Sequence, residues 1–314
     1  MKRRMGWWIL SAISIVTLWF AAAPLAAAEV IVEKDIVYGT GGGKDLKLNL
    51  ARPNHSNGLL PAIVYIHGGG WRYGNRKDYQ SAIEEAARRG YVAVTVTYRL
   101  SDPDPSGKPR NPFPAQIEDV KCAIRWLRAN AEKYHVDANR IGATGSSAGG
   151  HLSLLVGTTG TGRGPFAASQ ANGTSPNFEG NGGNAGISSN VQAVVNYFGP
   201  TDLARLHATS KRAAGLLENL LDGPPEKQAA LYKAASPITY VSKDDPPTLT
   251  IHGTADPVVP VEQATEFDAA MKKAGASHTL LLLQGEGHGF TPKGNKTAGE
   301  ATFKFFDAHL KNKS

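Results

Sequence analysis

Short apolar runs alternate with amphipathic stretches along most of this chain. The apolar runs predict eight strands, near residues 31–38, 46–52, 61–66, 91–97, 140–145, 191–197, 247–252 and 277–284. The amphipathic stretches predict helices near residues 78–89, 114–131, 147–157, 261–274 and 298–311. Because apolar strands alternate with amphipathic helices, we expect an α/β fold with a mostly parallel, eight-stranded sheet and helices on both of its faces.

Two regions depart from this alternation. The first two predicted strands have alternating patterns and no helix between them, so they should form an antiparallel edge of the sheet. Residues 158–190 are dense in Gly, Asn, Ser and Thr and lack hydrophobic periodicity, which predicts a long surface loop. That loop is either a simple connector or one wall of a substrate cleft. Residues 201–245 contain short helical patterns near 213–221 and 226–235 and predict a small lid-like insertion.

Residues 1–28 have the pattern of a secretory signal peptide. Lys2, Arg3 and Arg4 form a basic start, an apolar stretch follows, and three alanines precede Glu29, so cleavage is expected after Ala28. The alternative is an uncleaved membrane anchor, since the apolar stretch is near the lower length limit for spanning a bilayer. The pattern favours a secreted or periplasmic protein without stable membrane association after cleavage.

Charge and cysteine content narrow the function classes. Cleavage after Ala28 would lower the formal net charge from +7 to +4, because three basic residues and no acidic ones leave with the signal peptide. The remaining basic residues are scattered and no nucleic-acid-binding motif is present, so no nucleic-acid partner is expected. Cys122 is the only cysteine, lies in an amphipathic run, and is interpreted as a buried helix residue. No cluster has metal-ligand spacing, so we expect neither a metal nor a cofactor.

The pentapeptide Gly145-Ser146-Ser147-Ala148-Gly149 has the form G-x-S-x-G and lies between a predicted strand and a predicted helix. In that context it is a candidate nucleophile elbow, in which Ser147 adopts a strained backbone conformation and projects its hydroxyl beyond the sheet. The flanking glycines would relieve crowding. Taken alone, the pentapeptide could equally be a Gly/Ser-rich turn. Ser146 is the close competitor for the role of nucleophile.

A glycine-rich segment follows the predicted strand near 61–66. Its sequence is His67-Gly68-Gly69-Gly70-Trp71, and consecutive glycines allow backbone amides to point toward one position without obstructing a substrate carbonyl. The expected oxyanion-hole donors are the amides of Gly69 and Gly70, together with that of Ala148. His67 is interpreted as a structural brace for this loop rather than as a catalytic base.

Asp256 and His288 each follow a predicted strand and complete the candidate set. Carboxyl ends of parallel strands lie at one edge of a sheet, so Asp256 should lie at the same edge as Ser147. His288 lies in a glycine-rich loop after the last predicted strand, from which it can reach back to Ser147. In this arrangement His288 would be the general base and Asp256 the acid that orients it.

Two other carboxylates compete with Asp256. Asp202 also follows a predicted strand, and Glu286 lies two residues before His288. Asp256 is preferred because it follows the strand that bears the acid in α/β-hydrolases, which this motif order resembles, while Asp202 is placed to cap the next helix. The order serine, aspartate, histidine matches that of α/β-hydrolases.

On these motifs, residues 30 to 312 resemble the α/β-hydrolase superfamily. The glycine-rich loop and the elbow are similar to those of the hormone-sensitive-lipase-like and acetyl-esterase branch, and more closely to those of secreted bacterial carbohydrate esterases, including acetylxylan and feruloyl esterases. The resemblance implies one α/β-hydrolase domain over residues 29–314. Residues 29–60 predict two strands where that branch carries a helical cap, which favours an open cleft without a large N-terminal cap.

The resemblance implies a secreted serine carboxylester hydrolase acting on a small-molecule or carbohydrate ester, with short-chain acyl, acetyl or feruloyl groups as the expected substrates. A serine peptidase or amidase of the same fold is the alternative, and an inactive scaffold protein is the rival outside catalysis. Trp71 and Phe290 near the motifs are either aromatic platforms for substrate or packing residues beneath the loops.

Overall fold

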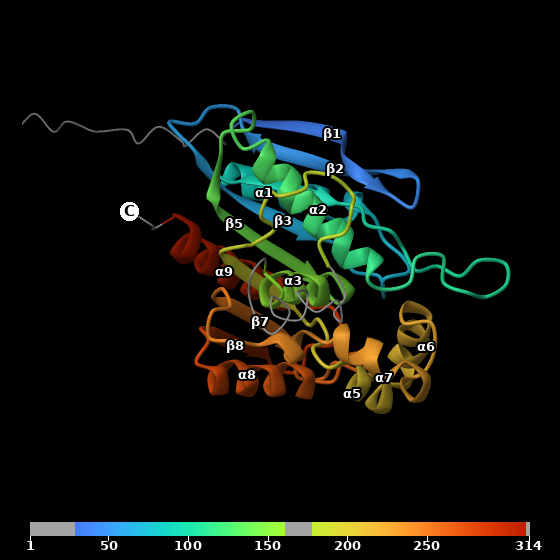
Figure 1. Cartoon of the computed structure of the whole chain (residues 1–314). Coiled ribbons are helices and arrows are strands. Elements are labelled where there is room, and N and C mark those ends of the chain that lie inside the picture. The colour runs from blue at the N-terminus through green and yellow to red at the C-terminus, as the bar shows by residue number, and fades with distance from the viewer. Residues whose placement is uncertain (1–28, 161–177, 312–314) are drawn as a thin grey trace, which may run out of the picture.

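The computed structural model describes residues 29–160 and 178–311 and contains one open, eight-stranded sheet with the order β1-β2-β4-β3-β5-β6-β7-β8 (Figure 1). The strands are β1 (Val30–Gly41), β2 (Lys44–Pro53), β3 (Leu60–Ile66), β4 (Val92–Val96), β5 (Val136–Ser146), β6 (Ala193–Tyr197), β7 (Thr248–Gly253) and β8 (His278–Leu283). Strands β3 to β8 pair in parallel, while β2 pairs antiparallel with both β1 and β4. The predicted fold class and the antiparallel edge are confirmed.

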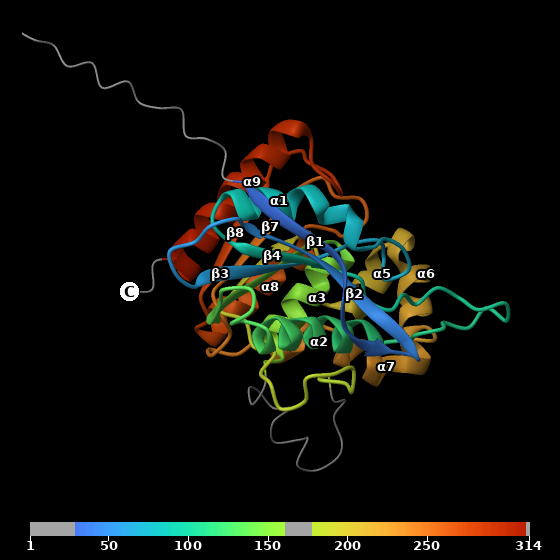
Figure 2. The same ribbon diagram turned by 90° about the horizontal axis from the view of Figure 1, so that it is seen from above.

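Helices cover both faces of this sheet (Figure 2). They are α1 (Gln80–Arg88), α2 (Ala115–Ala129), α3 (Ala148–Thr158), α5 (Leu203–Thr209), α6 (Lys211–Leu220), α7 (Pro225–Ala234), α8 (Glu262–Ala274) and α9 (Pro292–Phe306), with 3-10 turns η1 (Arg76–Tyr79) and η2 (Pro237–Tyr240) and a π-helical turn η3 (Asp307–Lys311).

The alternation of side chains along β3 shows how the two cores are separated. Ala62, Val64 and Ile66 pack into a cluster that includes residues of α2, α3 and α8, whereas Ile63 and Tyr65 pack into a second cluster with α1 and α9. Every strand residue from Ala62 to Ile66 is therefore buried, as expected for a central parallel strand.

The last long helix differs from the prediction. Sequence periodicity predicted a helix near 298–311, but α9 begins at Pro292 and ends at Phe306. The Thr291 side chain accepts a hydrogen bond from the Gly294 amide, and proline is favourable at a first helical position. Two glycines within the first eight residues of α9 had obscured its periodicity.

The insertion at 201–245 forms three helices rather than the two that were predicted. Helix α5 was not predicted, while α6 and α7 correspond to the predicted segments within a few residues. Figure 1 shows these helices at the end of the sheet to which the β5 arrow points. In the part of the chain that the structure describes, no helix is long and apolar enough to cross a membrane.

Candidate active site

Ser147 lies at the turn between β5 and α3, with φ 53° and ψ −119°. A positive φ is unfavourable for a residue with a side chain, so the packing around the turn must hold this conformation. A Cβ on Gly145 would lie 2.4 Å from the carbonyl oxygen of Ile66, and one on Gly149 only 2.0 Å from the same oxygen. Both glycines are thus required for β5 and α3 to approach β3.

The structure brings Ser147, His288 and Asp256 into one hydrogen-bonded row. His288 Nε2 lies 2.9 Å from Ser147 Oγ, and His288 Nδ1 lies 2.7 Å from Asp256 Oδ2. A carboxylate can only accept, so Nδ1 carries the proton and Nε2 is free to accept one from the serine hydroxyl. This is the geometry in which an imidazole can act as a general base toward serine.

The carboxylate of Asp256 is buried and held from both sides. Its other oxygen, Oδ1, accepts hydrogen bonds from the amides of Val258 at 2.8 Å and Val259 at 2.9 Å. Burial alone would raise the pKa of Asp256, but hydrogen bonds from His252, His288 and the Val259 amide outweigh burial and hold that pKa well below its usual range. The carboxylate therefore stays ionised beside His288 at neutral pH.

Two glycines in the loop after β3 have positive φ values. Gly69 and Gly70 have φ values of 107° and 58°, which glycine adopts readily. Neither amide donates a hydrogen bond to any residue that the structure describes. Ala148 is the first residue of α3, so its amide has no acceptor within the helix. These three amides, predicted as oxyanion donors, remain available to an incoming oxygen.

His67 and Trp71 anchor this loop to the neighbouring core through the contacts of their side chains. The His67 ring stacks on Tyr98 with a centroid distance of 4.1 Å, and its Nδ1 lies 2.8 Å from the Gly68 carbonyl oxygen. Trp71 is buried, and its indole Nε1 donates to His151 Nδ1 at 3.1 Å. His151 in turn lies 2.7 Å from the carbonyl oxygen of Ala235 through Nε2. Trp71 thus packs beneath the loop, which was one of the two roles considered for it.

The competing candidates have other partners. Ser146 Oγ accepts a hydrogen bond from the Tyr79 hydroxyl at 2.9 Å. Asp202 caps α5 by accepting from the Arg205 amide, as its sequence position suggested. Glu286 accepts from the amide and the hydroxyl of Thr291, both at 2.6 Å. None of these side chains contacts His288 through a hydrogen bond in the described residues.

The sequence reasoning missed two side chains that contact the row. His252 Nε2 lies 3.5 Å from Asp256 Oδ2, and the spacing His252-Gly253-Thr254-Ala255-Asp256 at the end of a strand was the available signal. Phe198 follows β6 with φ 41°, and its ring packs edge-on against His288 at a centroid distance of 4.8 Å. Phe198 has no sequence signal, since this contact depends on how two distant loops converge.

The insertion reaches this site. A Cβ on Gly70 would lie 2.7 Å from Cδ1 of Leu216 in α6, so α6 lies directly against the glycine-rich loop. The Ser210 hydroxyl donates to the Val258 carbonyl at 2.7 Å, which links the insertion to the loop that bears Asp256. These contacts join the insertion to the loops after β3 and β7.

The described part of the Gly/Asn-rich loop lies along α2 rather than beside the Ser147–His288–Asp256 row. Residues 178–190 pack along α2, where Glu179 pairs with Lys121 at 2.9 Å and with Arg125 at 2.7 Å. Residues 161–177, and with them most of the predicted cleft wall, lie outside the described residues, as do residues 1–28. Within the described ranges, no group of three or more His, Cys, Asp or Glu residues is arranged to hold a metal.

Comparison with known proteins connects this geometry to one family. The sequence model of the BD-FAE family matches residues 48–271. Esterase LipQ of Mycobacterium tuberculosis is 34% identical over 253 residues, which are 77% of this chain and 53% of the relative. The chain spans about half the length of the curated relatives that it matches.

Two solved structures match along nearly their whole length. A truncated carbohydrate esterase from gut microbiota has a TM-score of 0.70 at 28% identity, covering 90% of this chain and 98% of that one. A propionate-bound esterase from Thermogutta terrifontis has a TM-score of 0.67 at 30% identity, covering 90% of this chain and 93% of that one. These matches confirm the resemblance drawn from the motifs.

Proposed function

This chain belongs to the BD-FAE family of α/β hydrolases, and from that premise we propose that it is an exported serine carboxylester hydrolase. Its expected substrates are short-chain acyl esters, including acetyl or feruloyl esters of carbohydrates. The observation that carries the proposal is the row Ser147–His288–Asp256, with hydrogen bonds of 2.9 and 2.7 Å beside a strained serine.

The proposed reaction is acyl transfer in two steps. Ser147 Oγ attacks the ester carbonyl carbon while His288 Nε2 takes the serine proton, and the carbonyl oxygen becomes an anion facing the amides of Gly69, Gly70 and Ala148. The intermediate then collapses, the carbon–oxygen bond to the alcohol breaks, and His288 returns the proton to the departing oxygen. Water repeats the sequence on the acyl-enzyme, releases the acid and restores Ser147.

Asp256 has a different task in this proposal. Its ionised carboxylate accepts from His288 Nδ1, which keeps Nε2 unprotonated and directed at Ser147. The same charge stabilises the imidazolium that forms when His288 takes the serine proton. The low pKa of Asp256 supports this role, because a protonated carboxyl would carry no charge to stabilise the imidazolium.

Three observations support a short or bulky-alcohol ester over a long-chain lipid. Residues 29–60 form the β1–β2 hairpin instead of a helical cap over the site. Tyr73, two residues after the glycine-rich segment His67–Trp71, is 57% exposed and offers an aromatic surface for a sugar ring. Among similar structures, one is named a carbohydrate esterase and another holds propionate, a three-carbon acid. Export is supported by the signal-peptide pattern of residues 1–28.

A panel of chromogenic substrates tests the proposal. p-Nitrophenyl acetate and butyrate should be hydrolysed much faster than the octanoate, and acetylated or feruloylated saccharides should also be cleaved. Faster hydrolysis of octanoyl than of acetyl esters would contradict the open-cleft argument and indicate a lipid substrate. Faster cleavage of aminoacyl amides than of any ester would favour the peptidase or amidase alternative.

A further inference from the structure

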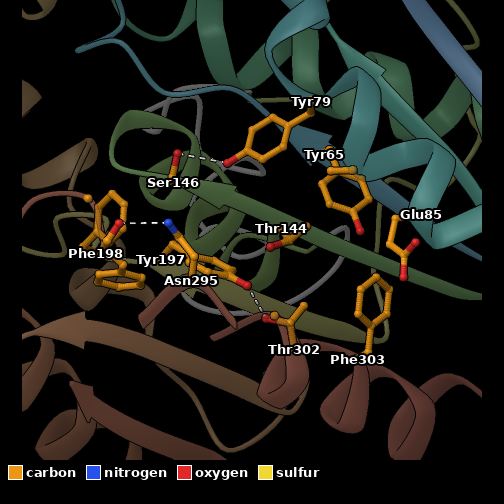
Figure 3. Close-up of a pocket in the computed structure, with 14 residues that line it drawn as sticks. Tyr65, Tyr79, Glu85, Thr144, Ser146, Tyr197, Phe198, Asn295, Thr302 and Phe303 are labelled. Atoms are coloured by element: carbon orange, nitrogen blue, oxygen red, sulfur yellow. Dashed lines mark hydrogen bonds between the residues drawn. The ribbon is translucent and has the colours of Figure 1, made fainter. Parts of the chain in front are cut away.

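A cavity of about 450 Å³ lies between α1 and α9, over the ends of β3, β5 and β6 (Figure 3). We call it the α1–α9 pocket. Six aromatic side chains line it: Tyr65, Tyr79, Tyr197, Phe198, Phe290 and Phe303. Ser147, His288 and Asp256 are absent from its lining, as are the three proposed oxyanion donors, so this pocket is distinct from the hydrogen-bonded row.

Strand and helix periodicity explain why these side chains converge. Thr144 and Ser146 lie two residues apart on β5 and both line the pocket, because alternate strand residues share a face. The opposite wall is formed by Asn295, Gly299 and Thr302 with Phe303, whose spacing places them on one face of α9. Gly299 lies in the middle of that face, and a Cβ there would meet no atom within 4 Å.

Two hydroxyl groups in the pocket have no hydrogen-bond partner among the described residues. Tyr65 is only 6% exposed and Thr144 only 2%, and the two pair side by side on β3 and β5. The neighbouring phenols differ: Tyr79 donates to Ser146 Oγ, and Tyr197 pairs with the Thr302 hydroxyl at 2.5 Å. Since burial raises the pKa of Tyr65 well above its usual range, its hydroxyl stays protonated and can donate or accept.

The charge of the lining favours a neutral occupant. Of the lining residues that the structure describes, Glu85 alone is charged, and its half-exposed carboxylate already accepts from Arg89 at 2.7 Å. Among residues 29–160 and 178–311, no lysine, arginine or histidine lines the pocket to compensate a carboxylate or phosphate. An anionic ligand would therefore lose its hydration without gaining a partner.

We propose that the α1–α9 pocket binds a small, uncharged, hydroxylated aromatic molecule, at a site separate from the one where esters react. Its ring packs among the aromatic side chains, where offset and edge-to-face contacts are favourable. Its hydroxyl pairs with the free hydroxyls of Tyr65 and Thr144. A volume of about 450 Å³ is within the range of small-molecule sites.

Occupancy of this pocket affects the proposed reaction through Phe198. That ring lines the pocket, packs against Phe290 at a centroid distance of 5.0 Å, and also packs against the His288 ring at 4.8 Å. Ser146, at one end of the pocket in Figure 3, is the chain neighbour of Ser147. This step rests on the proposed function, whereas binding itself does not.

Binding of p-cresol, measured by isothermal titration calorimetry, tests the site. Gly299→Leu extends a side chain into the pocket and should weaken binding more than about tenfold, which corresponds to 1.4 kcal/mol. Glu300→Leu adds the same side chain at the next, exposed position of α9 and is the matched control, with wild-type affinity expected. Ala82→Leu fills the pocket from α1 and serves if Gly299→Leu does not fold.

Tyr65→Phe isolates the hydroxyl. It should weaken p-cresol binding about tenfold, the value of one hydrogen bond, while leaving toluene binding unchanged. p-Hydroxybenzoate, which adds a carboxylate, should bind more weakly than p-cresol to the wild type. Equal p-cresol affinity in Gly299→Leu, Ala82→Leu and wild type, or no binding to wild type, would refute the site.

Kinetics separate this inference from the proposed function. With an acetate ester as substrate, p-cresol should change kcat as well as kcat/KM, and Gly299→Leu should remove that effect while retaining hydrolysis. Purely competitive inhibition would place p-cresol in the catalytic cleft and contradict a separate site. If the protein binds p-cresol but hydrolyses no ester, the proposed function is refuted and the proposed binding site is not.

Discussion

His252 approaches the same carboxylate oxygen of Asp256 that accepts the hydrogen bond from His288. Its Nε2 lies 3.5 Å from Asp256 Oδ2 and 2.8 Å from the carbonyl oxygen of Val259. A carbonyl oxygen only accepts, so Nε2 carries the proton and is shared between these two acceptors. His252, at the end of β7, thus contacts the following loop at both the Asp256 carboxylate and the Val259 carbonyl.

Replacement of His252 by phenylalanine tests whether these contacts of His252 position Asp256. An aromatic ring is kept, but the imidazole N–H that lies 2.8 Å from the Val259 carbonyl oxygen and 3.5 Å from Asp256 Oδ2 is lost. We expect kcat for an acetate ester to fall at least about tenfold with little change in KM. An unchanged kcat in a folded His252→Phe protein would mean that Asp256 is held by the Val258 and Val259 amides alone.

Two aspartates distinguish the assigned acid from its competitor. Asp256→Asn preserves shape but removes the charge that orients His288, so kcat should fall on the order of 10⁴-fold with little change in binding. Asp202→Asn alters only the cap of α5 and should leave kcat near wild type. Steady-state kinetics of both variants decide the assignment, and an equal or larger loss for Asp202→Asn would transfer it.

Gly149 should tolerate no side chain. A Cβ there would lie 2.0 Å from the Ile66 carbonyl oxygen, which neither backbone can relieve without moving β3 from α3. Gly149→Ala should lower the free energy of unfolding by about 2–3 kcal/mol. Gly299→Ala, at an open position inside α9, should raise it by about 0.5–1 kcal/mol. Urea denaturation measures both, and equal stabilities would show that the elbow is less crowded than described.

His151 should make stability depend on pH. Burial lowers the pKa of His151 to about 4, whereas an unfolded histidine has a pKa of about 6.5. Between these values the unfolded chain binds a proton that the folded chain does not, so stability falls as pH drops from 6.5 toward 4. The slope should be about 1.4 kcal/mol per pH unit, or roughly 3 kcal/mol in total.

His151→Gln can keep both hydrogen bonds but cannot titrate. Its unfolding free energy should therefore decline less steeply over this range than that of the wild type, while other buried histidines contribute equally to both proteins. Chemical denaturation at several pH values measures the two slopes. Parallel slopes would mean that His151 gains a proton in the folded state as easily as in the unfolded chain.

The strands and the hydrogen-bonded row could be predicted because their signals are local. The apolar run before His67 and the glycines around Ser147 specify a strand and a sharp turn by their own sequence. The start of helix α9 was predicted six residues too late, because Gly294 and Asn295 have low helix propensity. The N-cap at Thr291 is a local signal in the sequence, but it is a weak one.

Contacts between distant loops could not be predicted. Phe198 meets His288 only because the loops after β6 and β8 fold toward each other, and no periodicity records that approach. The hydrogen bond from Trp71 to His151 likewise joins residues 80 positions apart. The residue types in both contacts are common in protein cores, so the sequence does not mark them as neighbours of the site. Only the folded structure shows that they lie there.

The most direct test of the central claim compares two adjacent serines. Ser147 Oγ lies 2.9 Å from His288 Nε2, whereas Ser146 Oγ accepts from Tyr79 in the wall of the α1–α9 pocket. Initial rates of p-nitrophenyl acetate hydrolysis are measured for Ser147→Ala and Ser146→Ala, with folding of each checked by circular dichroism. We predict that folded Ser147→Ala has no activity above background and that Ser146→Ala keeps most of the wild-type rate. A folded Ser147→Ala protein that still turns over the ester, or an inactive but folded Ser146→Ala protein, would contradict the account.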